Sequence, residues 1–213
     1  MASTGYDVWL WDLDGTLVDT EWGYIRERFD RVGDRLGVEF TDRDAADIWH
    51  GFGGSREQAL RARDIDPATF WPAFHAVEDP TARAEATYLY DDATVIADLE
   101  APTGVVTHCQ RFLADPVLDH LDIRDWFDTV ICCTDDTGWK PDPAPVEQAL
   151  AAIDAPRTSG VLVGDSTGDV GAAWNAGLDA VHVERHHPAR RGYCVLGDHQ
   201  VTDLTAVPGL NSD

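Results

Sequence analysis

The sequence has almost no lysine. Of its 16 basic residues one, Lys140, is a lysine and the rest are arginines, and 39 acidic residues bring the formal net charge to -23. An acidic surface repels nucleic acid and anionic lipid, so we exclude both as partners. Such a surface also suits high cytoplasmic salt, where counterions screen self-repulsion. We therefore expect a halophilic protein, with an unusually acidic mesophilic protein as the alternative.

Long apolar runs and patterned cysteines are also missing. No stretch approaches the roughly 20 apolar residues that span a bilayer, and the first residues lack the basic-then-apolar pattern of a secretory signal. We therefore expect a cytoplasmic protein without a membrane partner. Cys132 and Cys133 are adjacent and Cys109 and Cys194 are isolated, which is neither metal-ligand nor redox spacing, so reduced thiols are expected.

The chain nevertheless has the apolar content of a globular protein, since 44% of its 213 residues are hydrophobic. Short apolar runs predict strands, and segments with helical spacing separate the later ones. The predicted strands are Tyr6–Asp12, Thr103–Thr107, Thr129–Cys133, Gly160–Gly164 and Ala180–Val183, and the predicted helices between them are Arg111–Leu121, Pro143–Ile153 and Asp169–Ala176. This alternation predicts an α/β fold with a Rossmann-like parallel sheet, whose ligands bind beyond the carboxyl ends of the strands.

A long interval separates the first two predicted strands. It has several helix-like stretches and no convincing strand, and it is longer than a crossover helix needs. The helix-like stretches are Glu21–Leu36, Asp42–Trp49, Arg56–Arg63 and Thr81–Tyr88. We therefore expect residues 1–17 and 89–213 to form a core domain, and residues 18–88 to form an inserted helical cap domain.

Polar residues follow the predicted strands. Asp12 and Asp14 lie two positions apart after the first strand, Thr107 ends the second, and Asp165 and Asp169 follow the fourth. Two of these features have an ordinary interpretation, because Asp-x-Asp-Gly favours turns and Asp169 could simply start the next helix, whereas Asp165 has no such alternative. The lone Lys140, before a predicted helix, suggests a role for a compact ammonium, although a surface lysine is the alternative.

Together, in this order and at strand ends, the four motifs resemble the haloacid dehalogenase superfamily. Their spacing resembles the phosphoglycolate phosphatase and β-phosphoglucomutase-like branch, which carries a helical cap. The resemblance implies that Asp12 is the nucleophile that forms an aspartyl phosphate and that Asp14 is the general acid and base. It implies that Thr107 and Lys140 hold the phosphoryl group.

The resemblance also implies a magnesium ion, which prefers oxygen ligands. Its ligands would be the Asp12 carboxylate, the Asp14 backbone carbonyl and Asp165, while Asp169 would orient metal-bound water or Lys140. Asp14 argues against a dehalogenase, which lacks this acid, and the absence of lysine between Val18 and Tyr88 argues against phosphonate cleavage through a Schiff base.

The substrate is expected to be a small phosphorylated metabolite. Arg56 lies in a glycine-rich segment that resembles the specificity loop of cap-bearing relatives, and it would bind a carboxylate or second phosphate; a surface salt bridge is the alternative. His108 follows Thr107 where relatives often have asparagine, and it either alters the mouth of the site or is an ordinary surface histidine. A phosphatase is the leading hypothesis, with a phosphomutase or a catalytically silent binding protein as alternatives. The sequence leaves the oligomeric state open.

Overall fold

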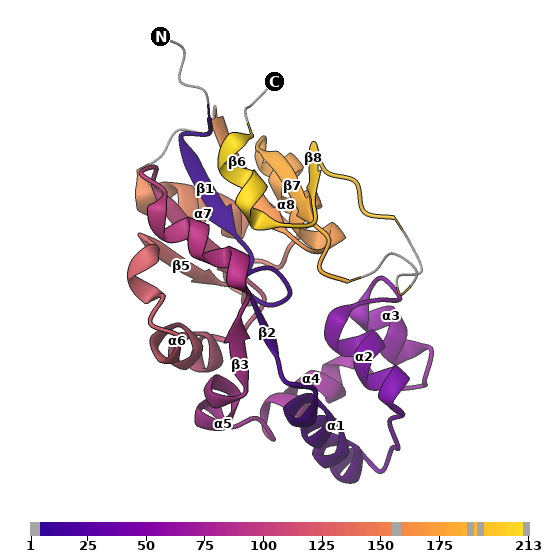
Figure 1. The fold of residues 1–213 in the computed structure, drawn as a ribbon. Helices are drawn as coiled ribbons and strands as arrows, with labels where there is room; N and C mark the ends of the chain where they lie inside the picture. The colour runs from indigo at the N-terminus through magenta and orange to yellow at the C-terminus, as the bar shows by residue number, and fades with distance from the viewer. Residues whose placement is uncertain (1–4, 155–158, 187–189, 191–193, 211–213) are drawn as a thin grey trace.

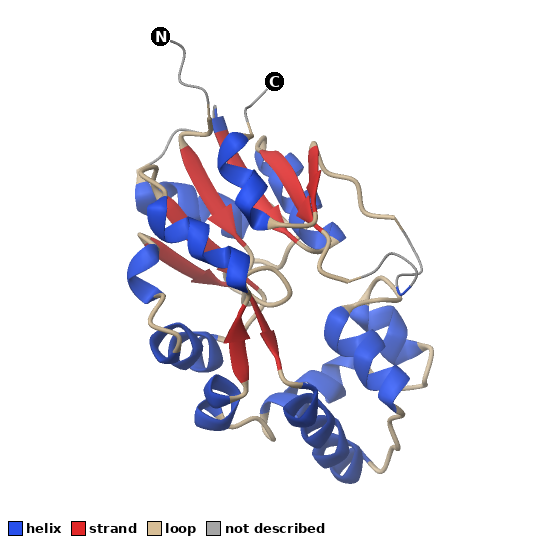
Figure 2. Ribbon diagram, in the orientation of Figure 1, coloured by secondary structure: helices blue, strands red, loops and turns tan. Residues whose placement is uncertain are grey.

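The computed structural model describes residues 5–154, 159–186, 190 and 194–210. In this part of the chain a sheet of six parallel strands has the order β5-β4-β1-β6-β7-β8. Figure 1 shows the fold by position in the chain, and Figure 2 shows the strands in red and the helices in blue. The strands are β1 (Val8–Trp11), β4 (Thr103–Thr107), β5 (Thr129–Cys132), β6 (Gly160–Gly164), β7 (Asp179–Val183) and β8 (His199–Val201). The predicted α/β fold with a parallel sheet is confirmed.

Helices cover both faces of this sheet. They are α6 (Arg111–His120), α7 (Ala144–Ile153), α8 (Thr167–Ala176) and the 3-10 helices η1 (Asp91–Asp98), η2 (Arg124–Trp126) and η5 (Leu204–Gly209). The three α-helices fall where helical spacing predicted them, with ends that differ by one or two residues.

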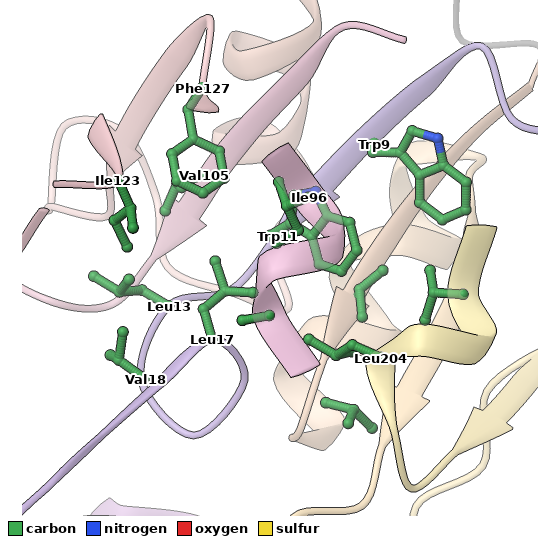
Figure 3. Close-up of a cluster of buried hydrophobic side chains, with 14 of the residues drawn as sticks. Trp9, Trp11, Leu13, Leu17, Val18, Ile96, Val105, Ile123, Phe127 and Leu204 are labelled. Carbon is green, nitrogen blue, oxygen red and sulfur yellow. The ribbon is translucent and has the colours of Figure 1, made fainter. Parts of the chain in front are cut away.

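The two faces of the sheet bury two separate apolar cores, because successive residues of a strand point to opposite sides. In β1, Trp9 and Trp11 pack in a core that includes residues of α6, η1 and η5, and Figure 3 shows this cluster. Val8 and Leu10 pack on the other face with residues of α7 and α8. Because both faces of the sheet are buried, the sequences of the strands are continuous apolar runs.

The interval between β1 and β4 contains five further helices, and the first four of them share an apolar core of their own. They are α1 (Trp22–Leu36), α2 (Asp42–His50), α3 (Arg56–Arg61), α4 (Pro67–His75) and α5 (Pro80–Glu85). Phe29, Phe70 and Phe74 form the centre of that core, with ring centroids of neighbouring pairs 5.2 to 6.2 Å apart. Among the described residues, no helix is long and apolar enough to cross a membrane.

A two-stranded antiparallel ribbon of β2 (Val18–Thr20) and β3 (Thr87–Leu89) connects these helices to the sheet. Figure 2 shows it between the sheet and the lower group of helices. The expectation that this interval contains no strand is therefore wrong at both ends, because three-residue strands carry too little pattern to be recognised. Helix α5 lies within the range predicted for the cap but packs against α6. The domain boundaries at 17/18 and 88/89 stay a prediction.

Candidate active site

The predicted site residues of three strands lie at one edge of the sheet. Asp12 directly follows β1, Thr107 ends β4 and Asp165 directly follows β6. β1 lies between β4 and β6, and the backbone nitrogen of Asp12 donates a hydrogen bond to the Val163 carbonyl at 2.9 Å. The carboxyl ends of parallel strands meet at one edge, so these residues are brought together although far apart in sequence.

Lys140 connects the site residues through its ammonium. Its Nζ donates to Asp12 Oδ1 at 2.7 Å, to Asp169 Oδ1 at 2.5 Å and to the Val106 carbonyl at 2.8 Å. These three acceptors use all three N–H groups of an ammonium. Lys140 is 7% exposed and lies among carboxylates, so it is not the surface lysine that the sequence left as an alternative.

Asp169 has two roles at the beginning of α8. It forms a capping box with Ser166, in which its Oδ2 accepts hydrogen bonds from the Ser166 nitrogen at 3.0 Å and hydroxyl at 2.6 Å. Its other oxygen accepts from Lys140. Burial acts to raise the pKa of Asp169, but the Lys140 charge and the hydrogen bonds from Lys140 and Ser166 lower it overall. The helix cap therefore also fixes the lysine.

Carboxylates outnumber the cations around Asp12. Oxygens of Asp12, Asp165 and Asp169 lie within 4.8 Å of one another. Burial raises the pKa of Asp12 to about 7, the Lys140 ammonium opposes the rise, and Asp169 and Asp14 add to it. Carboxylates this close together repel one another, and a divalent cation with oxygen ligands would offset that repulsion. The residues present therefore fit Mg²⁺.

Gly15 permits this arrangement. Its backbone has a φ of 82°, and a Cβ atom built on it would lie 2.8 Å from Asp165 Oδ2. Any other residue would be strained in that conformation and would displace the Asp165 carboxylate. The Asp-x-Asp-Gly sequence thus does form a turn, and the turn makes room for a carboxylate from another strand.

Asp14 is held by Arg83, a residue that the sequence analysis did not identify. Arg83 Nη2 donates to Asp14 Oδ1 in a short ion pair, and its Nη1 donates to the Thr87 hydroxyl at 3.0 Å. Arg83 belongs to α5, is 1% exposed, and has its guanidinium 5.1 Å from the Trp49 ring. A buried arginine needs such partners. No sequence motif includes Arg83. The alanines on either side of it are the only sequence feature that indicates a buried helix face.

Thr107 and His108 follow one another at the end of β4. The Thr107 hydroxyl is buried and accepts a hydrogen bond from the Cys109 nitrogen at 3.0 Å, so its own proton remains available to an acceptor. The His108 ring packs edge-on against Trp139, with centroids 5.4 Å apart. Burial, together with the charges of Lys140 and Arg56, lowers the pKa of His108 to about 3. His108 is therefore a neutral, partly buried residue near the site and not an ordinary surface histidine.

Arg56 begins α3, where Ser55 caps the helix. Its Nη2 donates to the Trp49 carbonyl at 3.0 Å. Within the described ranges no carboxylate lies at ion-pair distance from Arg56, which goes against the salt-bridge alternative. Its charge lowers the pKa of both His50 and His108, behind burial as the main cause. The Arg56 guanidinium therefore acts on both His50, at the end of α2, and His108, which follows β4.

Comparison with known proteins agrees with this geometry. Residues 9–183 match the model of the haloacid dehalogenase-like hydrolase family. A validoxylamine A 7'-phosphate phosphatase from Streptomyces hygroscopicus is 29% identical over 215 residues, which cover 95% of this chain and 96% of that protein. The pyrophosphatase PpaX of Bacillus velezensis is 28% identical over 180 residues, which cover 82% of this chain and 81% of that protein. The phosphoglycolate phosphatase of Photorhabdus laumondii is 28% identical over 180 residues, covering 80% and 76%.

Solved structures share the fold. A haloacid dehalogenase-like hydrolase from Streptococcus pneumoniae aligns with a TM-score of 0.74 at 18% identity, covering 95% of this chain and 96% of that one. A phosphatase of the same superfamily from Thermococcus onnurineus aligns with a TM-score of 0.65 at 21% identity, covering 97% and 100%. These alignments and the match over residues 9–183 confirm the predicted resemblance, and the chain belongs to the haloacid dehalogenase-like hydrolase family.

Proposed function

We propose that this protein is a magnesium-dependent phosphatase that transfers the phosphoryl group of a small phosphate monoester to Asp12 and then to water. The observation that carries the proposal is the buried Lys140 ammonium shared between Asp12 and Asp169, with Asp165 alongside. This network supports the proposal because it brings an ammonium and a carboxylate, the kind of group that can attack phosphorus, to the edge of the sheet where ligands bind.

In the first step an Asp12 oxygen attacks phosphorus, and the bond from phosphorus to the ester oxygen breaks. The leaving oxygen takes a proton from Asp14, whose Oδ1 is held by Arg83 and whose Oδ2 remains to exchange that proton. In the second step water attacks phosphorus of the aspartyl phosphate, Asp14 takes the proton from water, and Asp12 is released with inorganic phosphate. The Thr107 hydroxyl would donate a hydrogen bond to a phosphoryl oxygen, and the Lys140 ammonium would stabilise the phosphoryl oxygens by its positive charge.

Mg²⁺ would be held by the Asp12 and Asp165 carboxylates and the Asp14 backbone carbonyl, and it would supply positive charge against the transferring phosphoryl oxygens. The chain itself favours an ionised nucleophile through Lys140, which opposes the effect of burial on the Asp12 carboxyl. Asp169 keeps the lysine in place through the capping box at the start of α8.

The substrate class rests on the relatives, which are named as phosphatases of validoxylamine A 7'-phosphate and phosphoglycolate and as a pyrophosphatase. All are small phosphorylated molecules. Arg56 and the neutral His108 would contact the part of the substrate that is not transferred. The mouth of the site thereby differs from relatives with asparagine at that position.

The experiment is phosphate release from a panel of pyrophosphate, phosphoglycolate and sugar phosphates, with and without Mg²⁺. The wild type should release phosphate only with the metal, and Asp12→Asn should be inactive while keeping its circular dichroism spectrum. Turnover by folded Asp12→Asn would remove Asp12 as nucleophile, and no release from any substrate by the wild type would favour a silent binding protein. NMR of a sugar bisphosphate distinguishes a mutase, which returns the phosphoryl group to the sugar.

A further inference from the structure

Three metal-ligating side chains from distant parts of the chain meet away from the active-site carboxylates. Asp19 lies on β2, His50 is the last residue of α2, and His186 follows β7. One donor atom from each lies within 4.8 Å of the other two. The cluster joins the ribbon, the cap helices and the sheet domain.

The two imidazoles are positioned by a third ring. The centroids of His50 and His186 are 4.6 Å apart. Phe52 stacks on His50 at 4.9 Å and meets His186 edge-on at 4.9 Å, and it is only 6% exposed. An apolar wall of this kind limits the access of water to a metal and restricts ligand rotation.

The carboxylate is oriented by hydrogen bonds in the way that ligating carboxylates usually are. Asp19 Oδ1 accepts from the Thr20 nitrogen at 2.7 Å, and Oδ2 accepts from the Tyr90 hydroxyl at 3.0 Å. An ionised carboxylate has about four lone-pair sites, so both oxygens keep capacity for a cation. The two hydrogen bonds therefore fix the orientation of the Asp19 carboxylate and leave lone pairs available to a metal ion.

We infer that Asp19, His50 and His186 form a binding site for a divalent transition-metal ion such as Zn²⁺, which ties the cap helices to the sheet domain. Two imidazole nitrogens and one carboxylate oxygen suit Zn²⁺, Co²⁺ or Ni²⁺, whereas Mg²⁺ prefers oxygen ligands. Three protein ligands leave a fourth position for water. The site uses none of the carboxylates assigned to phosphoryl transfer.

The inference of a metal site rests on the distances between Asp19, His50 and His186, and the charge state of His50 is compatible with it. Burial, together with the charges of His186, Arg56 and Arg190, lowers the pKa of His50 to about 3. Neutral imidazole is the form that binds metals. The same arginines repel a cation, and the Asp19 carboxylate offsets part of that repulsion.

The test is Zn²⁺ binding to the full chain in excess Mg²⁺, measured by competition with a chromophoric chelator. The wild type should bind one more tight equivalent than His50→Ala or Asp19→Asn, whose affinity at this site should fall by more than about 100-fold. Tyr90→Phe, which removes only the hydrogen bond to Asp19, should weaken binding by about 10-fold. His120→Ala, the same change at an exposed histidine on α6, should match the wild type.

X-ray absorption of the wild type loaded with Zn²⁺ keeps the inference testable even if a variant does not fold. The spectrum should contain the scattering of two imidazole rings. Zinc should also raise the melting temperature of the wild type and of His120→Ala but not that of Asp19→Asn, because an ion that binds only the folded chain stabilises it. A spectrum without imidazole, or equal zinc stoichiometry and affinity in the wild type, His50→Ala and Asp19→Asn, would overturn the inference.

Discussion

Replacing Lys140 with methionine tests whether the active-site network is an ion cluster that depends on one ammonium. Methionine keeps an unbranched chain of similar length but removes the charge and three hydrogen bonds, to Asp12, Asp169 and the Val106 carbonyl. Removing one partner of a buried ion pair typically costs about 3–5 kcal/mol, since the remaining charges stay buried without compensation. At about 2–4 °C per kcal/mol for a chain of this size, the melting temperature should fall by about 6–20 °C.

The deficit should depend on pH, with a definite sign. Without the ammonium, nothing opposes the effect of burial and of the Asp169 and Asp14 charges on Asp12, so the pKa of its folded carboxyl rises further above its unfolded value. A carboxyl with a raised folded pKa contributes stability at low pH that is lost as pH rises through that pKa. Relative to the wild type, Lys140→Met should therefore be least impaired near about pH 5 and most impaired near about pH 8.

The assay is thermal unfolding followed by circular dichroism at fixed salt, in the absence of Mg²⁺. Arg43→Met is the matched control, because it removes a cation whose side chain is 89% exposed and lies 3.9 Å from Asp47. An exposed pair of this kind contributes about 0–1 kcal/mol, so the control should change the melting temperature little. A decrease for Lys140→Met that equals the control, or that is the same at every pH, would refute the argument.

Three further predictions concern the metal, the surface and the cap. Asp165→Ala should weaken Mg²⁺ binding, with partial recovery of activity at raised metal concentration; an unchanged calorimetric titration would remove Asp165 from the ligands. Because the net charge is -23, the melting temperature should rise from low to molar KCl as the Debye length falls from about 30 to about 3 Å, and a flat response would count against halophilic adaptation. Burial raises the pKa of Glu78 from an ordinary 4.5 to about 7, so its stabilising contribution is complete below the unfolded pKa and is lost as pH rises through about 7. Glu78→Gln should therefore be more stable than the wild type by up to about 3 kcal/mol near pH 8 and equal to it near pH 4 in denaturant unfolding; equal stability at both pH values would exclude this effect.

The strands of the sheet were predictable because both faces are buried. Their residues form continuous apolar runs, and the predicted Thr103–Thr107 and Gly160–Gly164 agree with β4 and β6 residue for residue. The three-residue β8 has no such run, since its His199 and Gln200 are polar. Its place at the edge of the sheet depends on pairing with β7, a long-range contact that local pattern does not contain.

Helix α4 was missed for a different reason. Proline is disfavoured at most helix positions, and this segment contains Pro67 and Pro72. However, Pro67 is the first residue of α4, where a proline loses no helical hydrogen bond, and Asp66 caps the helix. Burial of Phe70 and Phe74 keeps the helix in place despite Pro72. Tertiary packing thus overrode a local signal.

The candidate site could be predicted only for residues that follow predicted strands, because the carboxyl ends of parallel strands lie at one edge of the sheet. Asp12, Thr107 and Asp165 were expected at strand ends, and the structure shows them at the ends of three neighbouring strands, an order that was not predicted. Arg83 could not be predicted, because its ion pair with Asp14 joins a short helix to a turn that lies 69 residues earlier. Such a contact depends on how α5 packs, which no spacing rule encodes.

The most direct test of the central claim is the location of covalent phosphate on the wild-type protein during turnover. The protein would be mixed with substrate and Mg²⁺, quenched in acid and digested, and its peptides analysed by mass spectrometry. The account predicts acid-stable, base-labile phosphate on Asp12, as expected for a carboxylate that attacks phosphorus. Phosphate on any other residue, or rapid phosphate release with none attached to Asp12 at any time point, would contradict it.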